Sequence, residues 1–102
     1  MNAILATHHD ALAALCRQAG ARRLDAFGSV LREDFVADSS DLDFLVEFDE
    51  LSRSDYASAY FTLKGGLETL FGRPVDLVTP ANLANPYFRE RIAAESRNLY
   101  AR

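Results

Sequence analysis

The fold of this chain is decided by Phe27-Gly28-Ser29, which is followed, after an eleven-residue gap, by Asp41-Leu42-Asp43-Phe44-Leu45-Val46. Side chains alternate between the two faces of a β-strand, so Asp41 and Asp43 are expected on one face, with Leu42 and Phe44 in the core. Two adjacent carboxylates repel each other unless a cation lies between them. The spacing therefore predicts a metal-binding strand that follows a glycine-serine turn.

The expected metal is Mg²⁺. Carboxylate oxygens are hard ligands, and no histidine or thiol stands at a matching spacing, which disfavours zinc. Taken alone, Gly28-Ser29 is typical of a turn and Asp41-x-Asp43 of solvated loop charge. In this order along one chain, the two together indicate metal-assisted nucleotide chemistry.

The composition is that of an ordinary globular protein. The 102 residues are 49% apolar and 25% charged, which favours a single domain over 1–102 and argues against disorder. The formal net charge of −4 gives no broad attraction to nucleic acid, so we expect no direct nucleic-acid partner.

Neither a disulfide nor a membrane span is expected. The single cysteine, Cys16, stands in a helical apolar stripe that predicts a packed thiol. No stretch approaches the roughly 18 apolar residues of a membrane span, and the N-terminus has no basic segment followed by a hydrophobic one. We therefore expect a cytoplasmic protein without membrane contact.

Hydrophobic periodicity predicts alternating helices and strands. Gly20 and Gly72 are natural helix ends, and Gly65-Gly66 predicts a kink or a close packing contact. Helices are expected over 2–19, 54–71 and 86 to about 100, strands over 22–28, 42–48 and 75–78, a short helix or turn over 29–33, a polar loop over 35–40, and a further helix start at Thr79-Pro80. These elements predict an α+β domain with three or more strands and helices covering one face of the sheet.

A third aspartate completes a family resemblance. Val75-Asp76-Leu77-Val78, together with Gly28-Ser29 and Asp41-x-Asp43, resembles the minimal nucleotidyltransferases (MNT) of the DNA polymerase β-like superfamily. The resemblance covers nearly the whole chain, including the closing Tyr87-Phe88-Arg89-Glu90-Arg91-Ile92. It implies a small mixed sheet with helices packed on one face.

The resemblance is especially close to the stand-alone MNT antitoxins of HEPN/MNT toxin–antitoxin systems. It implies an enzyme that transfers AMP from Mg-ATP to a tyrosine of a HEPN ribonuclease toxin and so inactivates it. The implied cofactor is Mg²⁺, with two ions, and the implied assembly is a hetero-oligomer with the toxin.

The site residues follow from the same resemblance. Asp41, Asp43 and Asp76 would be both the catalytic residues and the metal ligands, because two metal ions roughly 4 Å apart can stabilise the attacking and leaving oxygens. The expected nucleotide-binding residues are Gly28, Ser29 and Arg32: the glycine lets the backbone approach phosphate, and the other two offer donors to the triphosphate.

The sequence departs from the family pattern at two points. The gap between Ser29 and Asp41 is eleven residues rather than the common ten, and Glu33 stands where glycine is frequent. An acid near the triphosphate is electrostatically unfavourable, so the departure concerns the phosphate geometry and leaves the metal carboxylates intact.

The remaining polar residues have simpler interpretations. His8 and His9 point about 100° apart on a helix and are read as structural. Tyr56, Tyr60, Tyr87 and Tyr100 are read as core or interface residues on apolar helix faces rather than as nucleotide stackers. Solvated charge rather than metal ligation is expected of Asp25, Asp34, Asp38, Glu47, Asp49 and Glu50.

Two other functions compete with AMP transfer to a toxin. One is a non-catalytic antitoxin that neutralises its partner by direct binding. The other is a small-molecule nucleotidyltransferase like those that inactivate aminoglycosides, although these carry a substrate-binding domain for which this sequence offers no counterpart. Asp41→Asn with Asp43→Asn separates the first alternative from catalysis, since masking would survive the substitutions.

Overall fold

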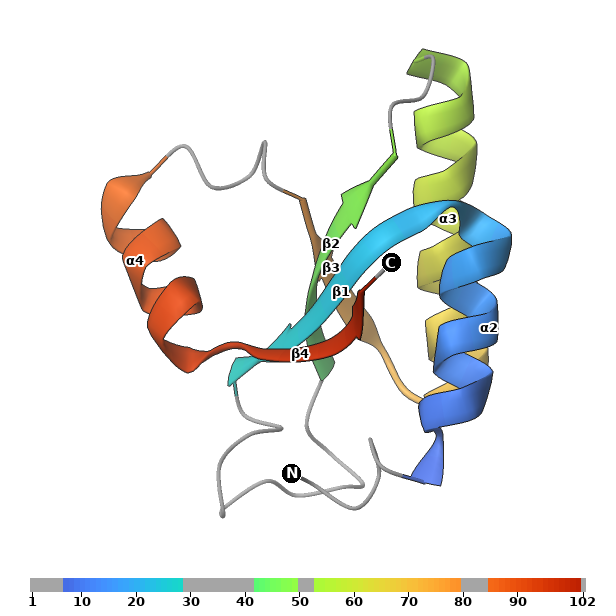
Figure 1. Cartoon of the computed structure of the whole chain (residues 1–102), viewed down its shortest axis with the longest axis horizontal. Coiled ribbons are helices and arrows are strands. Elements are labelled where there is room, and N and C mark those ends of the chain that lie inside the picture. The colour runs from blue at the N-terminus through green and yellow to red at the C-terminus, as the bar shows by residue number, and fades with distance from the viewer. Residues whose placement is uncertain (1–6, 29–41, 50–52, 80–84, 102) are drawn as a thin grey trace.

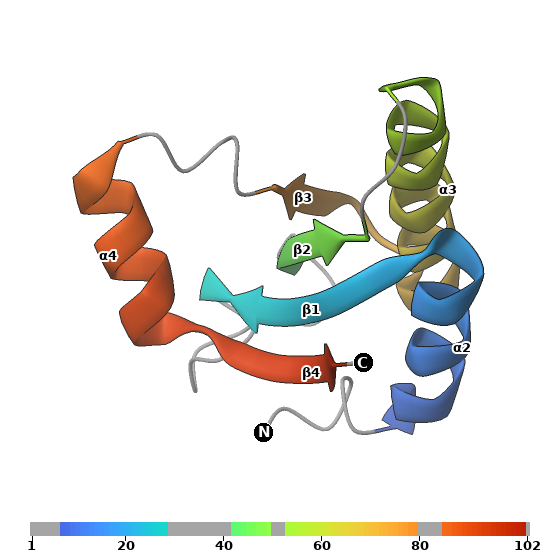
Figure 2. The ribbon, with the colours of Figure 1, turned by 45° about the horizontal axis from the view of Figure 1, so that its top comes forward.

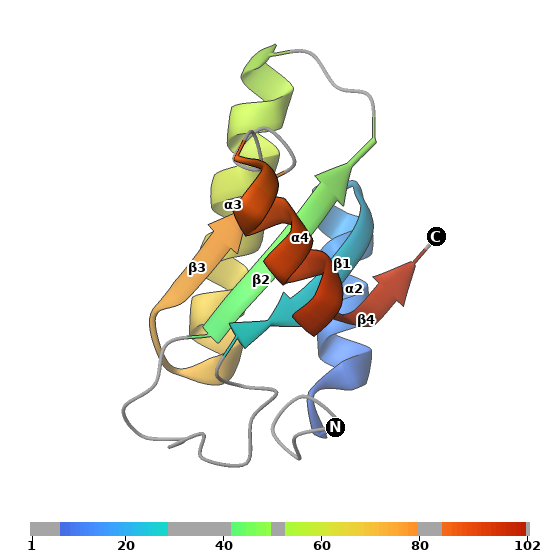
Figure 3. The same cartoon turned by 90° about the vertical axis from the view of Figure 1, so that its left-hand side faces the viewer.

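A four-stranded mixed sheet forms the centre of the molecule (Figures 1 and 3). The computed structural model describes residues 7–28, 42–49, 53–79 and 85–101. Along the chain it contains α2 (His9–Ala19), β1 (Ala21–Phe27), β2 (Leu42–Phe48), α3 (Arg53–Phe71), β3 (Val75–Val78), α4 (Pro86–Glu95) and β4 (Arg97–Ala101). The strand order is β3-β2-β1-β4, in which β2 pairs parallel with β3 and β1 pairs antiparallel with both of its neighbours. The predicted α+β class is confirmed.

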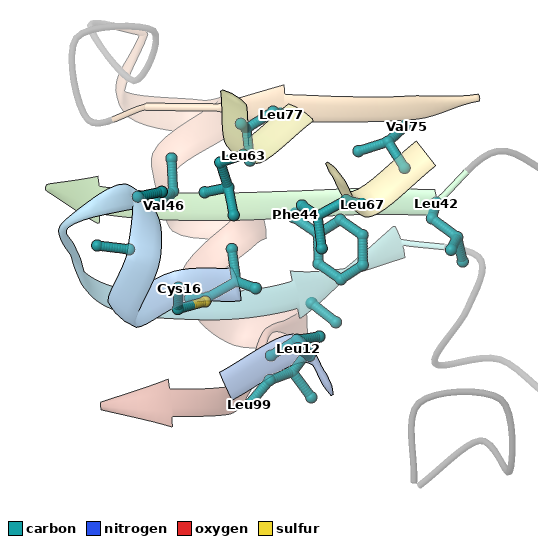
Figure 4. Packing of buried hydrophobic residues seen from close by; sticks show 14 of the residues in the cluster. Leu12, Cys16, Leu42, Phe44, Val46, Leu63, Leu67, Val75, Leu77 and Leu99 are labelled. Carbon is teal, nitrogen blue, oxygen red and sulfur yellow. The ribbon is translucent and has the colours of Figure 1, made fainter. Parts of the chain in front are cut away.

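One face of the sheet carries the hydrophobic core. Side chains that alternate along the strands meet the inner faces of α2 and α3, as Figure 4 shows for Leu42, Phe44 and Val46 of β2 beside residues of the two helices. This alternation arises because apolar residues occupy every second position of β2. The buried members are Leu12, Cys16, Ala19, Ala21, Leu24, Ala26, Leu42, Phe44, Val46, Leu63, Leu67, Phe71, Val75, Leu77 and Leu99.

The two helices on the core face end where glycine permits it. Gly20 adopts φ 77° and its N–H reaches the carbonyl of Arg17, while Gly72 adopts φ 66° and its N–H donates to the carbonyl of Glu68 at 2.8 Å. Residues with a Cβ rarely take this left-handed conformation. The two predicted helix ends are therefore confirmed.

The glycine pair within α3 serves close packing. The helix runs without interruption from Arg53 to Phe71, and a Cβ placed on Gly66 would lie 2.6 Å from Cδ1 of Leu15 on α2. The same atom on Gly65 would meet nothing within 4 Å. Of the two predicted reasons for the pair, close packing applies to Gly66.

The C-terminal segment differs from the sequence prediction. The helix expected to reach about residue 100 ends at Glu95, and Arg97–Ala101 forms the edge strand β4 beside β1. Pairing with β1 buries Leu99 in the core and supplies hydrogen-bond partners to the β1 edge, which a longer helix would leave unpaired. The helical periodicity of this segment was outweighed by a long-range strand pairing.

The helix α4 lies on the side of the sheet opposite to α2 and α3 (Figures 1 and 2). Ile92 is 2% exposed, whereas every other α4 side chain that the structure describes is exposed. The helices α2 and α3 therefore cover one face, as predicted, whereas α4 lies on the other side (Figure 2) and buries only Ile92 among its described side chains. The helix start predicted at Thr79-Pro80 reaches beyond the described residues at Pro80. The turn over 29–33, the loop over 35–40 and the first residues of the predicted N-terminal helix also fall outside them.

Candidate active site

Two of the three predicted aspartates lie side by side on neighbouring strands. Asp43 of β2 pairs in parallel register with Asp76 of β3. Leu42 and Phe44, which flank Asp43, are buried in the core, so the alternation of the strand directs Asp43 to the opposite face. Val75 and Leu77 impose the same direction on Asp76. Neighbouring strands lie about 4.8 Å apart, and the two carboxylates therefore share one small area of the sheet.

Gly28 lies directly against the first of these carboxylates. The preceding residue, Phe27, is the β1 partner of Asp43. Gly28 has φ 78°, and a Cβ at this position would collide with Oδ2 of Asp43. Both the backbone conformation and the space therefore require glycine here. The backbone of the chain consequently passes beside the carboxylate without a side chain between them.

The area around Asp43 and Asp76 is accessible to a ligand. Asp43 is half-buried and Asp76 is exposed at the surface. Within the described ranges no group of three or more histidine, cysteine, aspartate or glutamate side chains is arranged to hold a metal ion. The other predicted site residues, Asp41, Ser29 and Arg32, lie outside those ranges. The described part of the site thus consists of Gly28, Asp43 and Asp76.

The structure corrects the interpretation of Asp25 as solvated charge. Asp25 is 4% exposed, and its carboxylate accepts hydrogen bonds from Nε of Arg23 at 3.1 and 3.2 Å and from Nδ2 of Asn98 at 2.9 Å. Asn98 also donates to the carbonyl of Tyr100 at 3.0 Å. These bonds compensate the burial of the charge and tie β4 to β1.

The sequence contained a signal for the placement of Asp25 that our prediction missed, because Asp25 stands between the apolar residues Leu24 and Ala26 on a strand. The two apolar neighbours face the core, so Asp25 lies on the same face of the sheet as Asp43. Its partner Asn98 is 73 residues away and belongs to a segment predicted as helix. Of the other expected surface acids, Glu47 is partly exposed and lies 3.9 Å from Arg22, and Asp34, Asp38 and Glu50 fall outside the described residues.

His8 takes a structural contact, as predicted, whereas His9 is exposed at the surface. The ring of His8 lies 5.0 Å from that of Phe71, and Nδ1 of His9 lies 3.6 Å from a carboxylate oxygen of Asp10. The predicted packed thiol is also present, because Cys16 is fully buried. Burial raises the pKa of Cys16 to about 12, and the nearby Arg17 opposes this shift only partly.

The four tyrosines divide into two groups. Tyr60 donates its hydroxyl to the carbonyl of Leu77 at 2.7 Å, and Tyr56 packs edge-on against Phe48 with ring centres 5.1 Å apart. Tyr100 lies on β4, rather than on a helix, and packs against the core.

Tyr87 is the exception among them. It is 84% exposed, on the first turn of α4. Tyr56, Tyr60 and Tyr100 pack against other residues, which agrees with the predicted core or interface role. Tyr87 lies outside the core.

The sequence model of the nucleotidyltransferase domain family matches residues 10–99. The chain belongs to this family. Among curated proteins, it is 39% identical over 66 residues to a candidate protein adenylyltransferase of Methanocaldococcus jannaschii, with 65% of this chain and 64% of that relative aligned. The chain thus matches just under two thirds of the length of that relative.

Solved structures share the fold. A candidate minimal nucleotidyltransferase is 38% identical, superposes with a TM-score of 0.72 and is covered over 95% of each chain. A toxin–antitoxin complex with AMP-PNP gives 20% identity and a TM-score of 0.66, with 92% of this chain and 73% of that chain covered.

A Shewanella oneidensis MNT antitoxin in complex with a tri-AMPylated HEPN toxin gives 20% identity and a TM-score of 0.64, with coverage of 96% and 73%. The predicted membership among minimal nucleotidyltransferases is confirmed, and the two complexes support the fold. In the part of the chain that the structure describes, no helix combines the length and the apolar character needed to cross a membrane.

Proposed function

We propose that this domain transfers AMP from Mg-ATP to a tyrosine hydroxyl of a cognate HEPN toxin and thereby acts as its antitoxin. The observation that carries the proposal is the register of Asp43 with Asp76, with the bare backbone of Gly28 against the first carboxylate. Two carboxylates at this spacing on an accessible edge fit hard divalent cations, and a side-chain-free approach fits phosphate.

In this proposal Asp41, Asp43 and Asp76 hold two Mg²⁺ ions. The described pair fits the task, because both carboxylates lie on the face of the sheet away from the core and carboxylate oxygens are the ligands that Mg²⁺ prefers. Bound Mg²⁺ would supply charge stabilisation for the attacking and leaving oxygens at the α-phosphorus. Asp41 would join the pair through the two-residue alternation of the strand that begins at Leu42.

Gly28, Ser29 and Arg32 bind the triphosphate in the same proposal. The left-handed backbone of Gly28 turns the chain away from β1 just beside Asp43. The Ser29 hydroxyl and the Arg32 guanidinium would act as phosphate donors. Their part in the proposal comes from the sequence pattern.

The acceptor hydroxyl needs a base or a cation beside it, because a free tyrosine has a pKa of about 10. Asp76 is the more exposed of the two described carboxylates and is suited to orient the incoming hydroxyl and to accept its proton. A HEPN toxin as the protein acceptor is supported by the family resemblance and by the complexes whose folds match this chain.

The test is to incubate the protein with Mg²⁺, ATP and the HEPN toxin encoded beside it, and to weigh both chains by intact mass spectrometry. The expected result is an AMP adduct on a toxin tyrosine and loss of ribonuclease activity. The adduct disappears with Asp43→Asn and with Asp76→Asn, while Glu47→Gln, four residues after Asp43 on the same face of β2, retains it.

The same variants separate catalysis from masking. If the toxin is silenced by the Asp43→Asn protein as strongly as by the wild type, without any adduct, neutralisation occurs by binding and the proposed transfer is rejected. A toxin that gains AMP only when Asp43 and Asp76 are intact supports the proposal.

A further inference from the structure

Tyr87 differs from the other tyrosines in the accessibility of its hydroxyl-bearing ring. All four tyrosines of the chain lie within the described residues. Tyr56, Tyr60 and Tyr100 are half-buried, and the hydroxyl of Tyr60 is engaged by the carbonyl of Leu77. Tyr87 is 84% exposed. A domain that modifies tyrosine hydroxyls thus displays one tyrosine of its own.

The backbone of Tyr87 is held in place by the start of α4. Its N–H donates to Oδ1 of Asn85 at 2.9 Å, and the N–H of Arg89 donates to the carbonyl of Asn85 at 3.1 Å. Pro86 occupies the first helical position, where its fixed φ suits the helix. The ring is therefore presented from an ordered helical turn, which lowers the entropy lost when a partner site receives it.

Tyr87 also lies on the appropriate side of the molecule. Asp43 and Asp76 face away from α2 and α3 because their strand neighbours are buried against those helices. The helix α4 lies on this same side of the sheet (Figure 2). Two copies that meet through this side can each offer Tyr87 to the site of the other, which is the self-complementary arrangement of a two-fold encounter.

We propose that Tyr87 is an acceptor of AMP in transfer between two copies of this chain, an inference that rests on the proposed adenylyltransferase function. The Tyr87 hydroxyl oxygen attacks the α-phosphorus of ATP bound to the other copy and forms the new P–O bond. The bond from the α-phosphorus to the oxygen bridging the β-phosphate breaks, and pyrophosphate leaves with the electron pair. The hydroxyl proton passes to a site carboxylate and then to water.

The first experiment uses the full chain with Mg²⁺ and ATP, without a toxin. The expected result is one AMP adduct that peptide mapping assigns to Tyr87. It is lost with Tyr87→Phe, which keeps the ring, and retained with the matched control Tyr56→Phe. Because two copies must meet, a twofold rise in protein concentration is expected to raise the initial fraction modified per unit time about twofold.

A mixing experiment tests transfer between copies. The Asp43→Asn chain retains Tyr87 but lacks a site carboxylate, and the Tyr87→Phe chain retains the site but lacks the acceptor. The mixture is expected to carry AMP on the Asp43→Asn chain only. If wild-type protein is modified but this mixture is not, transfer between copies is rejected.

The remaining outcomes distinguish this inference from the proposed function. An adduct at another residue, or an undiminished adduct on Tyr87→Phe, overturns the role of Tyr87. A preparation that adds AMP to the toxin but not to itself also overturns it and leaves the proposed function standing. Absence of AMP from both chains rejects the two proposals together.

Discussion

The two faces of the sheet are built on different principles. The face under α2 and α3 is apolar at every strand position that contributes to it, and its side chains are almost fully buried. The opposite face carries Asp25, Asp43 and Asp76, and the helix above it, α4, buries Ile92 and exposes its other described side chains. The comparison teaches that stability and chemistry are divided between the two sides of the same strands. Substitutions of the core residues should therefore change mainly stability, and substitutions of Asp43 or Asp76 mainly chemistry. Asp25 is the exception on the site face, because its carboxylate is buried and hydrogen-bonded to β4.

The core face should show the largest effect on stability. Leu67 is fully buried between α3 and the sheet, so Leu67→Ala removes its contacts and leaves a cavity. We expect a loss of about 2–5 kcal/mol from a total that is roughly 5–15 kcal/mol for a domain. Urea unfolding followed by circular dichroism measures the change.

Asp43→Asn provides the contrast on the other face, because its side chain lies outside the core cluster. It should leave the unfolding midpoint close to that of the wild type while AMP transfer is lost. If Asp43→Asn destabilised the fold as strongly as Leu67→Ala, the division between the faces would be wrong.

Gly28→Ala is expected to lower both the stability of the fold and the rate of AMP transfer. The substitution forces a Cβ into a left-handed conformation, at about 1–3 kcal/mol, and displaces the Asp43 carboxylate. Because misplacement by about 1 Å can cost roughly 10²-fold in rate, a loss of AMP transfer of that order is expected. Steady-state transfer rates, corrected for the folded fraction, measure it.

The matched control is Gly72→Ala. Gly72 has φ 66°, but a Cβ there would meet nothing within 4 Å. It carries the same backbone strain without a contact between its Cβ and a site carboxylate, and should lose stability without losing transfer. Equal loss of transfer in both variants would mean that the effect of Gly28 is general strain rather than its contact with Asp43.

Asp25→Ala tests whether the buried polar network holds β4 in place. The substitution removes the acceptor of hydrogen bonds from Arg23 and Asn98, and we expect a cost of about 1–3 kcal/mol. Hydrogen exchange should accelerate first at the amides of β4, an edge strand that pairs with β1 alone. Asp10→Ala, at a fully solvated carboxylate on α2, should leave both the midpoint and the exchange unchanged.

The smallest expected effect is the difference in stability between alanine substitutions at the two glycines of α3. Gly65→Ala gains helix propensity in open space and should stabilise the protein by about 0.5–1 kcal/mol. Gly66→Ala gains the same propensity but pushes its Cβ against Leu15, so this variant should be less stable than Gly65→Ala. Paired urea titrations decide the order, and a more stable Gly66→Ala would show that Leu15 moves aside at little cost.

Much of the fold was predictable because its signals are local. The alternation of apolar residues predicted strands over 42–48 and 22–28, and the observed strands β2 and β1 agree to within a residue. Gly20 and Gly72 predicted the ends of α2 and α3. The candidate site was predictable as a set of residue types from the family pattern. Three of its members, Gly28, Asp43 and Asp76, lie within the described residues, and their assignment as site residues stays a prediction.

The errors arose where distant segments decide the structure. Residues 97–101 have a pattern compatible with a helix, yet β1 offers them an unpaired edge and a place for Leu99 in the core. Asp25 looked like solvated charge because its partner Asn98 belongs to that same misassigned segment. Local periodicity carries no information about either pairing.

The sequence by itself determined strands β1 to β3, the helices α2 and α3, their apolar faces, and the carboxylates that face away from the core, because each follows from a two- or 3.6-residue period. Only the tertiary structure decided that β3 pairs in parallel with β2, so that Asp76 lies level with Asp43. It also decided that β4 forms the edge strand beside β1, and that α4 lies on the site side of the sheet with Tyr87 exposed (Figure 2). These features depend on which strands pair with each other. The pairing is determined by the total apolar surface that the fold buries, which involves residues far apart in the sequence.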